Sequence, residues 1–346
     1  MAGIRYPRPL RAGDRVEVPA PSSGVPPELH DRLDRAVADL RGRGFEVHEG
    51  PLARTGGLVA GTVDERLDEL RAAFASRPGA VLPPWGGDLA VELVDRLDWS
   101  ALAGDDVPTG APWFVGWSDL STLLLPLTIT TGVATLHGAN LMDEPWELPD
   151  GLARWTDVAA LAEGGTVVQH AAAHRRSRPW GAWADEPLDA ATACEEPTRW
   201  RSLDGRDVHA TGRLVGGCLE TVSLLAGSRY GDVPGFARRH APEGLVVHLE
   251  ASAADAATVL RLLWSLRLAG WFEPATAVLV GRTTAPDVDG LTQEDAVRHA
   301  LGDLGIPVVL DVDTGHQPPQ MPLVLGALAE VRLEAGRGSL AQTLVP

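Results

Sequence analysis

A serine lies between an apolar run and a helical pattern in Phe114-Val-Gly-Trp-Ser-Asp-Leu120. A serine held on a tight strand-to-helix turn projects its hydroxyl away from the backbone, and N–H groups at the helix start can stabilise developing negative charge. Ser118 is therefore a candidate nucleophile. A helix N-cap is the alternative, because Ser and Asp are favoured at helix starts. The segment also departs from the G-x-S-x-G pattern of hydrolases, since Leu120 replaces the second glycine.

A histidine and a glutamate could act as the base and the orienting group for such a serine. His316 lies on a proline-stiffened loop after an apolar run, which suits a general base. Glu250 ends the apolar run Val246-Val-His-Leu-Glu, from which it could fix the tautomer of a histidine. The simpler alternatives are a surface loop for His316 and a helix-start carboxylate for Glu250.

A metal site is a second interpretation of the C-terminal loop, because Asp311, Asp313 and His316 are all potential ligands. The other histidines are scattered along the chain and form no supporting cluster. We therefore expect no metal and no other cofactor.

Two glycine pairs indicate places where the backbone approaches a ligand or another segment closely. Gly86 and Gly87 follow a predicted strand, and the exposed N–H groups at the start of the next helix could hold an oxyanion or a carboxylate. A plain tight turn is the alternative, and the G-x-G-x-x-G fingerprint of dinucleotide sites is absent here. The second pair, Gly216-Gly217, leads into Cys218.

The composition excludes several kinds of function. A formal net charge of -17 repels phosphate backbones, so nucleic-acid binding is not expected. All 30 basic residues are arginines, which removes mechanisms that need a lysine. The sequence contains no run of about 18 apolar residues, which is the length needed to span a bilayer. Because the two cysteines are too few for a disulfide framework and the N-terminus lacks an apolar signal core, we expect a cytoplasmic protein without membrane partners.

The length of 346 residues predicts two domains. Short β-rich runs alternate with helical patterns in the first half, which favours βαβ units and a parallel, Rossmann-like or flavodoxin-like sheet over residues 1–165. A mixed α/β domain is expected over residues 211–346. Residues 166–210 lack clear periodicity and are predicted to form a linker and a Trp-rich loop insertion. The predicted helices cover residues 29–43, 64–75, 88–97, 253–268 and 292–304.

In their order along the chain, these segments resemble the LD-carboxypeptidase family of serine peptidases, which includes the microcin C7 self-immunity proteins. The resemblance extends over nearly the whole chain. It rests on Pro19-Ala-Pro-Ser-Ser23, Ala60-Gly61 with Arg66, Gly86-Gly87, Gly116-Trp-Ser-Asp119, Gly132-Val-Ala-Thr-Leu-His-Gly138, Gly216-Gly-Cys-Leu219, Leu249-Glu250, and Asp313-Thr-Gly-His316 with Pro322.

The resemblance implies Ser118 as nucleophile, His316 as general base and then acid, and Glu250 as the residue that orients His316. The backbone N–H groups of Gly87 and Asp119 would hold the oxyanion, and the active site would lie between two α/β domains. Trp117 and Cys218 stand where the family usually has Tyr and often has Asn. These two residues are expected to alter the substrate pocket, and Gly86 and Cys218 are expected to contact the substrate.

The substrate implied by the resemblance depends on the region from about 172 to 213, which carries Trp180, Trp183 and Trp200. The self-immunity-like branch of the family has a long Trp-bearing loop there, so we expect a peptidyl or aminoacyl nucleotide whose base stacks on Trp180 or Trp183. The alternative is that these rings anchor loops or a dimer contact. A murein tetrapeptide is the other candidate substrate, and a noncatalytic small-molecule binding protein is the alternative of another class. A homodimer is expected.

Overall fold

A computed structural model describes residues 3–104, 110–143, 148–177 and 194–346. The described residues form two larger sheets and a small two-stranded one. The first sheet has the order β14-β5-β4-β3-β1-β2, and every pair in it is parallel except β14 with β5. Its strands are β1 (Arg15–Val18), β2 (Glu46–Glu49), β3 (Ala80–Val81), β4 (Trp113–Gly116), β5 (Thr135–His137) and β14 (Leu323–Leu325).

The second sheet is mixed and has the order β6-β16-β15-β10-β11-β12-β13-β9. Strands β10 to β13 are parallel to one another, and the outer strands pair antiparallel. Its strands are β6 (Thr166–His170), β9 (Arg201–Ser202), β10 (Val208–Cys218), β11 (Leu245–Glu250), β12 (Ala275–Gly281), β13 (Val308–Val312), β15 (Leu328–Glu334) and β16 (Arg337–Thr343), while β7 (His174–Arg175) and β8 (Glu196–Pro197) pair separately.

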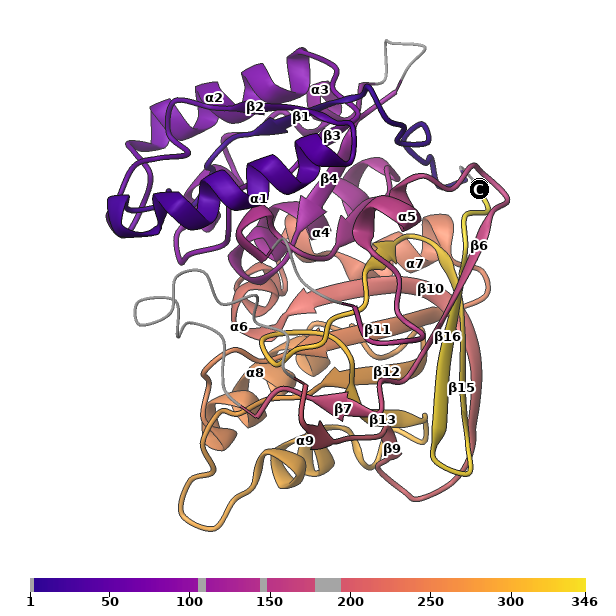
Figure 1. The fold of residues 1–346 in the computed structure, drawn as a ribbon. Helices are drawn as coiled ribbons and strands as arrows, with labels where there is room; N and C mark the ends of the chain where they lie inside the picture. The colour runs from indigo at the N-terminus through magenta and orange to yellow at the C-terminus, as the bar shows by residue number, and fades with distance from the viewer. Residues whose placement is uncertain (1–2, 105–109, 144–147, 178–193) are drawn as a thin grey trace.

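Figure 1 shows the first sheet with its helices at one end of the molecule and strands β10 to β13 at the other. The predicted α/β fold with a parallel-rich N-terminal sheet and a mixed C-terminal sheet is confirmed. None of the helices in the described ranges has the length and apolar character needed to cross a bilayer. The helices are α1 (His30–Gly42), α2 (Val63–Ala75), α3 (Trp99–Ala103), α4 (Ser121–Thr131), α5 (Trp155–Ala159), α6 (Leu219–Val222), α7 (Val233–His240), α8 (Ala256–Leu268) and α9 (Gln293–Leu301).

Helix starts in the sequence account for several of these boundaries. Thr62 and Glu65 form a reciprocal capping box at α2, and Thr292 and Asp295 form another at α9. The side chain of Asp255 accepts from Thr258 N at the start of α8. These side chains satisfy N–H groups that have no partner within their own helix.

The helix expected over 88–97 does not form, which corrects that prediction. Only a short 3₁₀ helix is present there, from Ala90 to Leu93. The reason lies on its C-terminal side, where the Asp98 side chain accepts from Ser100 N and Ala101 N and so starts the new helix α3. The first segment is left too short to propagate as an α-helix.

The segment expected to be a linker supplies strands to the second sheet. Strand β6 pairs with β16, and β9 pairs with β13. In the opposite direction, β14 comes from the C-terminal part of the chain and pairs with β5 of the first sheet. The two sheets thus exchange strands across the expected boundaries, and the boundaries at 165 and 211 stay predictions.

Helix α4, which follows Ser118, packs between the two sheets and contacts both β4 and β10. It is buried on nearly all sides even though Pro126 lies inside it. Behind its first turn, a Cβ at Gly217 would lie 2.7 Å from Ser121 Cβ, and Cys218 N donates to Ser121 Oγ at 3.1 Å. The glycine pair before Cys218 therefore permits the second sheet to approach the first turn of α4, the helix that follows Ser118.

Candidate active site

Ser118 lies just beyond the carboxyl end of β4 and opens a 3₁₀ helix that leads into α4. Its φ is 60°, a left-handed conformation that is uncommon for a residue other than glycine. Trp117 occupies the N-cap position and makes no side-chain cap, so Ser118 is not the helix cap. A backbone held in this way costs on the order of 1–3 kcal/mol and is found preferentially at functional sites.

The side chains of Ser118, His316 and Glu250 form a continuous hydrogen-bonded series. Ser118 Oγ lies 3.0 Å from His316 Nε2, and His316 Nδ1 lies 2.7 Å from Glu250 Oε2. With the proton on Nδ1, the ring donates to Glu250 and leaves the Nε2 lone pair facing the hydroxyl. The three residues come from the carboxyl ends of β4, β11 and β13, where open parallel sheets usually place ligands.

Glycine is required beside Glu250, whose side chain is fully buried. A Cβ at Gly315 would lie 2.5 Å from Glu250 Cβ, and one at Gly281 would lie 2.8 Å from the same atom. Gly315 also has a φ of 101°, which L side chains rarely adopt. The two glycines let the loop that carries His316 close around the carboxylate.

The pKa values of His316 and Glu250 are both shifted by the contact between the two side chains. Burial alone would lower the pKa of His316, but the Glu250 carboxylate and its hydrogen bond outweigh burial and raise that pKa above the ordinary value. Burial alone would raise the pKa of Glu250, but His316 outweighs it and lowers that pKa. The carboxylate therefore stabilises positive charge on the imidazole, which a general base acquires when it takes a proton.

The indole of Trp117 covers His316. The ring centroids lie 4.3 Å apart with an interplanar angle of 54°. Trp117 Nε1 donates to Asp143 Oδ2 at 2.6 Å, and Asn140 N donates to the same oxygen at 2.8 Å. This buried network fixes the indole, and the indole limits the rotation of the imidazole.

The turn at Gly86 and Gly87 faces the serine. A Cβ at Gly86 would lie 3.0 Å from Ser118 Cβ and 3.2 Å from Asp119 N, so only glycine fits there without movement. Gly87 has a φ of 148° and packs against Ser22. The Asp119 carboxylate accepts from Ser22 Oγ at 2.6 Å and from Ala90 N at 2.8 Å, which ties the serine turn to this glycine turn.

Two family models match this chain and identify its protein family. Residues 16–138 match the LD-carboxypeptidase N-terminal domain, and residues 211–331 match the LD-carboxypeptidase C-terminal domain. The chain belongs to the LD-carboxypeptidase family. The resemblance read from the sequence motifs is thereby confirmed, and the family membership makes the chain a serine peptidase.

The names of this family member's relatives indicate different substrates. A predicted carboxypeptidase of Streptomyces coelicolor is 30% identical over 342 residues, which cover 97% of this chain and 96% of the relative. A murein tetrapeptide carboxypeptidase of Pseudomonas aeruginosa is 28% identical over 264 residues, which cover 73% and 71%. Among solved structures, a microcin C7 self-immunity protein in complex with aspartyl sulfamoyl adenosine has a TM-score of 0.78 at 21% identity, with 98% and 99% of the two chains covered.

A cavity of about 380 Å³ in this LD-carboxypeptidase family member opens onto Ser118 and His316. Its lining includes three residues that the sequence analysis did not select, namely Trp85, Asn140 and Asp143. Trp85 Nε1 donates to Gly24 O at 3.2 Å, which holds its indole at the cavity wall. Its position directly before Gly86 was the available signal, whereas nothing in the sequence around Asn140 and Asp143 indicates their contact with Trp117.

The other expected substrate-binding residues are Cys218, Trp180 and Trp183. Cys218 is buried beside Glu250, and its Sγ lies 3.4 Å from Glu220 Oε2. Burial and the two nearby glutamates raise the pKa of the Cys218 thiol well above its ordinary value. Trp180 and Trp183 lie outside the described residues.

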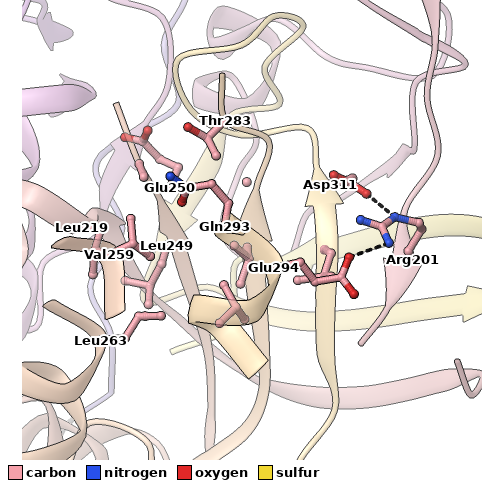
Figure 2. Close-up of a pocket in the computed structure, with 15 residues that line it drawn as sticks. Arg201, Leu219, Leu249, Glu250, Val259, Leu263, Thr283, Gln293, Glu294 and Asp311 are labelled. Carbon is pink, nitrogen blue, oxygen red and sulfur yellow. Dashed lines mark hydrogen bonds and ion pairs between the residues drawn. The ribbon is translucent and has the colours of Figure 1, made fainter. Parts of the chain in front are cut away.

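The aspartates of the alternative metal site are engaged elsewhere. Asp313 Oδ1 accepts from Arg282 at 2.7 Å and its Oδ2 from Trp200 Nε1 at 2.8 Å. Asp311 Oδ2 accepts from Arg201 Nε at 2.6 Å. Figure 2 shows this Arg201–Asp311 pair at the wall of a separate pocket of about 140 Å³, which Glu250 also lines. These ion pairs give no support to a catalytic metal held by the two aspartates.

Proposed function

We propose that the protein hydrolyses an amide bond in a peptidyl or aminoacyl nucleotide, with Ser118 as nucleophile, His316 as base and Glu250 as the orienting residue. The observation that carries the proposal is the hydrogen-bonded series in which Ser118 Oγ is 3.0 Å from His316 Nε2 and His316 Nδ1 is 2.7 Å from Glu250. Nucleophile, base and orienter in this order are the geometry of acyl transfer through a serine.

In the proposed reaction, Ser118 Oγ attacks the amide carbonyl while its proton passes to His316 Nε2. The N–H groups of Gly87 and Asp119 stabilise the oxyanion of the tetrahedral intermediate. As the C–N bond breaks, His316 returns the proton to the leaving amine, and an acyl-serine ester remains. Water then attacks this ester with His316 again as base, which releases the acid and restores Ser118.

A nucleotide-bearing substrate is favoured by the aromatic lining of the cavity. Trp85 and Trp117 are both part of its wall, and because Trp117 is buried against His316, the half-buried Trp85 is the ring that offers a face to a base. Stacking of a base on an aromatic ring is worth about 1–3 kcal/mol. The solved self-immunity protein that shares this fold carries aspartyl sulfamoyl adenosine, a molecule with an acyl group and a nucleobase. Trp180 and Trp183 stay candidates for a further stacking contact, and Gly86 and Cys218 for contacts with the acyl part.

Cleavage of a murein tetrapeptide is the second candidate function, supported by the Pseudomonas aeruginosa relative of that name. A carboxypeptidase must hold the free carboxylate next to the scissile bond, and arginine is the residue best suited to that task. Among the described residues that line the cavity, none is an arginine. A noncatalytic binding protein would have no need of the hydrogen bonds that join Ser118, His316 and Glu250.

The test compares hydrolysis of aspartyl and glutamyl sulfamoyl adenosine with hydrolysis of murein tetrapeptide, each with the parent protein and with Ser118→Ala. We expect cleavage of the adenosine compounds by the parent protein and its loss in the variant. Cleavage of murein tetrapeptide alone would replace the nucleotide proposal by the cell-wall one. Binding of either compound without turnover would support the noncatalytic alternative.

A further inference from the structure

Cys218 completes a cluster of metal-binding side chains behind the serine. Cys218 and Glu250 are direct partners in the parallel register of β10 and β11, so their side chains leave the sheet side by side. One donor atom each from Cys218, Glu250 and His316 lies within 4.8 Å of the other two. We call these three residues the Cys218–Glu250–His316 cluster.

The cluster has unused capacity to bind a cation. Glu250 Oε2 accepts from His316, but Glu250 Oε1 is buried and has no hydrogen-bond partner among the described residues. A buried carboxylate oxygen without a donor is costly, and a cation would satisfy it. The sulfur of Cys218 makes a 3.4 Å contact with Glu220 Oε2, a long and weak interaction, and also interacts with the Glu250 carboxylate.

Glu220 places a second carboxylate at the edge of the cluster, beside Cys218. Its Oε1 accepts from three successive backbone N–H groups, at 2.8, 3.0 and 3.1 Å, which hold the carboxylate in place. Its Oε2 is the atom that lies 3.4 Å from Cys218 Sγ. Glu220 Oε2 therefore lies beside the sulfur but outside the group of three mutually close donor atoms. The three N–H groups belong to Ser252, Ala253 and Ala254.

We propose that the Cys218–Glu250–His316 cluster binds a thiophilic divalent cation, with Zn²⁺ as the preferred ion, and that binding inhibits the enzyme. Zinc takes thiolate, imidazole and carboxylate ligands in tetrahedral sites, where neighbouring ligand atoms are about 3.3–3.7 Å apart. The His316–Glu250 contact must open and the sulfur must move in to reach this geometry. Mg²⁺ and Ca²⁺ prefer sites made of oxygen alone and do not suit this set.

Inhibition follows from the single lone pair of a neutral imidazole. A zinc ion bound at Nδ1 between His316 and Glu250 requires the remaining ring proton to be on Nε2, which faces Ser118. The Nε2 atom then has no lone pair with which to accept the serine proton. The thiol of Cys218 loses its proton to solvent when the ion binds. This consequence for turnover rests on the proposed function, whereas the binding site itself does not.

The binding test uses Ser118→Ala, which lacks the hydroxyl but keeps the cluster. Co²⁺ serves as a spectroscopic probe, because a bound thiolate gives a charge-transfer band, and Zn²⁺ affinity follows from its displacement of Co²⁺. We expect the band in Ser118→Ala and its loss when Cys218→Ser is added. Titration calorimetry with Zn²⁺ alone should show an affinity weaker on the order of 100-fold for the double variant. Cys194→Ser is the matched control, since it removes the other cysteine and should leave the band intact.

Circular dichroism and thermal unfolding without metal verify that each variant folds, and Cys218→Ala replaces Cys218→Ser if the latter does not. The site is refuted if Ser118→Ala gives no band, or if Cys194→Ser rather than Cys218→Ser removes it. In the parent protein, Zn²⁺ should abolish hydrolysis and EDTA should restore it. Full hydrolysis by zinc-loaded protein would overturn the inhibitory role. A cobalt band in a protein without hydrolytic activity would support the site and count against the proposed function alone.

Discussion

Ser118 is the residue proposed to attack the amide carbonyl, and among the described residues it is the hydroxyl that lies 3.0 Å from His316 Nε2. Replacing it by alanine removes the nucleophile but leaves the Glu250–His316 pair and the glycine turn in place. We expect Ser118→Ala to fold normally and to lower kcat by several orders of magnitude, with residual rate from binding and the oxyanion donors. Steady-state hydrolysis beside a thermal unfolding curve measures both. Near-normal activity in a folded variant would remove the serine mechanism.

The contact between Glu250 and His316 predicts the pH dependence of the reaction. His316 must be neutral to accept the serine proton, and its pKa in the free protein is raised, with burial opposed by Glu250. The acidic limb of kcat/KM should therefore have its midpoint above 6.5, with activity lost as pH falls through it. In Glu250→Gln the carboxylate is gone and burial remains, so the midpoint should move down.

Glu250→Gln should also reduce kcat, but by less than Ser118→Ala, because the imidazole can still act as a poorly oriented base. The measurement is a kcat/KM profile from pH 5 to 9 for the parent protein and the variant. An unchanged midpoint would return Glu250 to the role of a helix-start carboxylate.

At the scale of elements, the turn at Gly86 is the most sensitive part of the site. Gly86→Ala places a Cβ 3.0 Å from Ser118 Cβ and 3.2 Å from Asp119 N, so one of the two turns must shift. A misplacement of about 1 Å can cost on the order of 100-fold in rate, which is the loss in kcat that we expect. Gly42→Ala is the control, because its Cβ would meet open space at the end of α1.

The control should keep full activity and gain up to about 1 kcal/mol of unfolding free energy from helix propensity. Chemical denaturation of both variants separates stability from rate. Equal kcat in Gly86→Ala and the parent protein would show that the glycine turn does not hold the oxyanion.

The sequence predicts those elements whose signals are local. The capping residues Thr62 and Thr292 mark true helix starts, and the apolar run that ends at Glu250 is strand β11. The contact of Ser118 with His316 spans 198 residues, and its prediction came from a family resemblance, not from spacing. Trp85 was not predicted as a site residue, because a tryptophan beside a glycine turn is as typical of packing as of binding.

Pairings between distant strands could not be predicted. Strand β14 joins the first sheet through residues that follow His316, and β6 joins β16 near the C-terminus. Each strand is short, and its register is set by the partner's surface. The helix expected over 88–97 failed for a different reason, since the stronger cap at Asp98 started a new helix.

At the scale of the whole molecule, two buried histidines join the sheets. His137 ends β5 of the first sheet and His248 lies on β11 of the second, with ring centroids 4.9 Å apart. Both are buried, and among the described residues His137 Nε2 and both ring nitrogens of His248 lack hydrogen-bond partners. Burial lowers the pKa of His137 to about 4 and that of His248 well below its usual range.

The expected homodimer and cytoplasmic location are properties of the whole molecule that stay predictions. An average mass from light scattering, measured over a range of protein concentrations, tests the dimer directly. A mass near the 36.6 kDa of one chain would contradict it.

The histidine pair predicts acid sensitivity of the folded state. The unfolded chain takes up a proton at each histidine below pH 6.5, whereas folded His137 stays neutral down to about pH 4. The unfolded state thus binds more protons in this window, and His137 alone lowers the unfolding free energy by about 1.4 kcal/mol per pH unit. Between pH 7 and 5 this amounts to about 2 kcal/mol, with a further loss from His248.

His137→Phe removes the titrating group but keeps an apolar ring at the junction of the sheets. Urea unfolding at pH 7 and pH 5 should show a smaller difference for this variant than for the parent protein, by about 2 kcal/mol. His299→Gln, at an exposed position on α9, should leave the difference unchanged. Because Glu250 has a lowered pKa and also favours unfolding in acid, part of the loss persists in His137→Phe. An identical loss in His137→Phe and the parent protein would assign acid sensitivity to the carboxylates instead of the histidine pair.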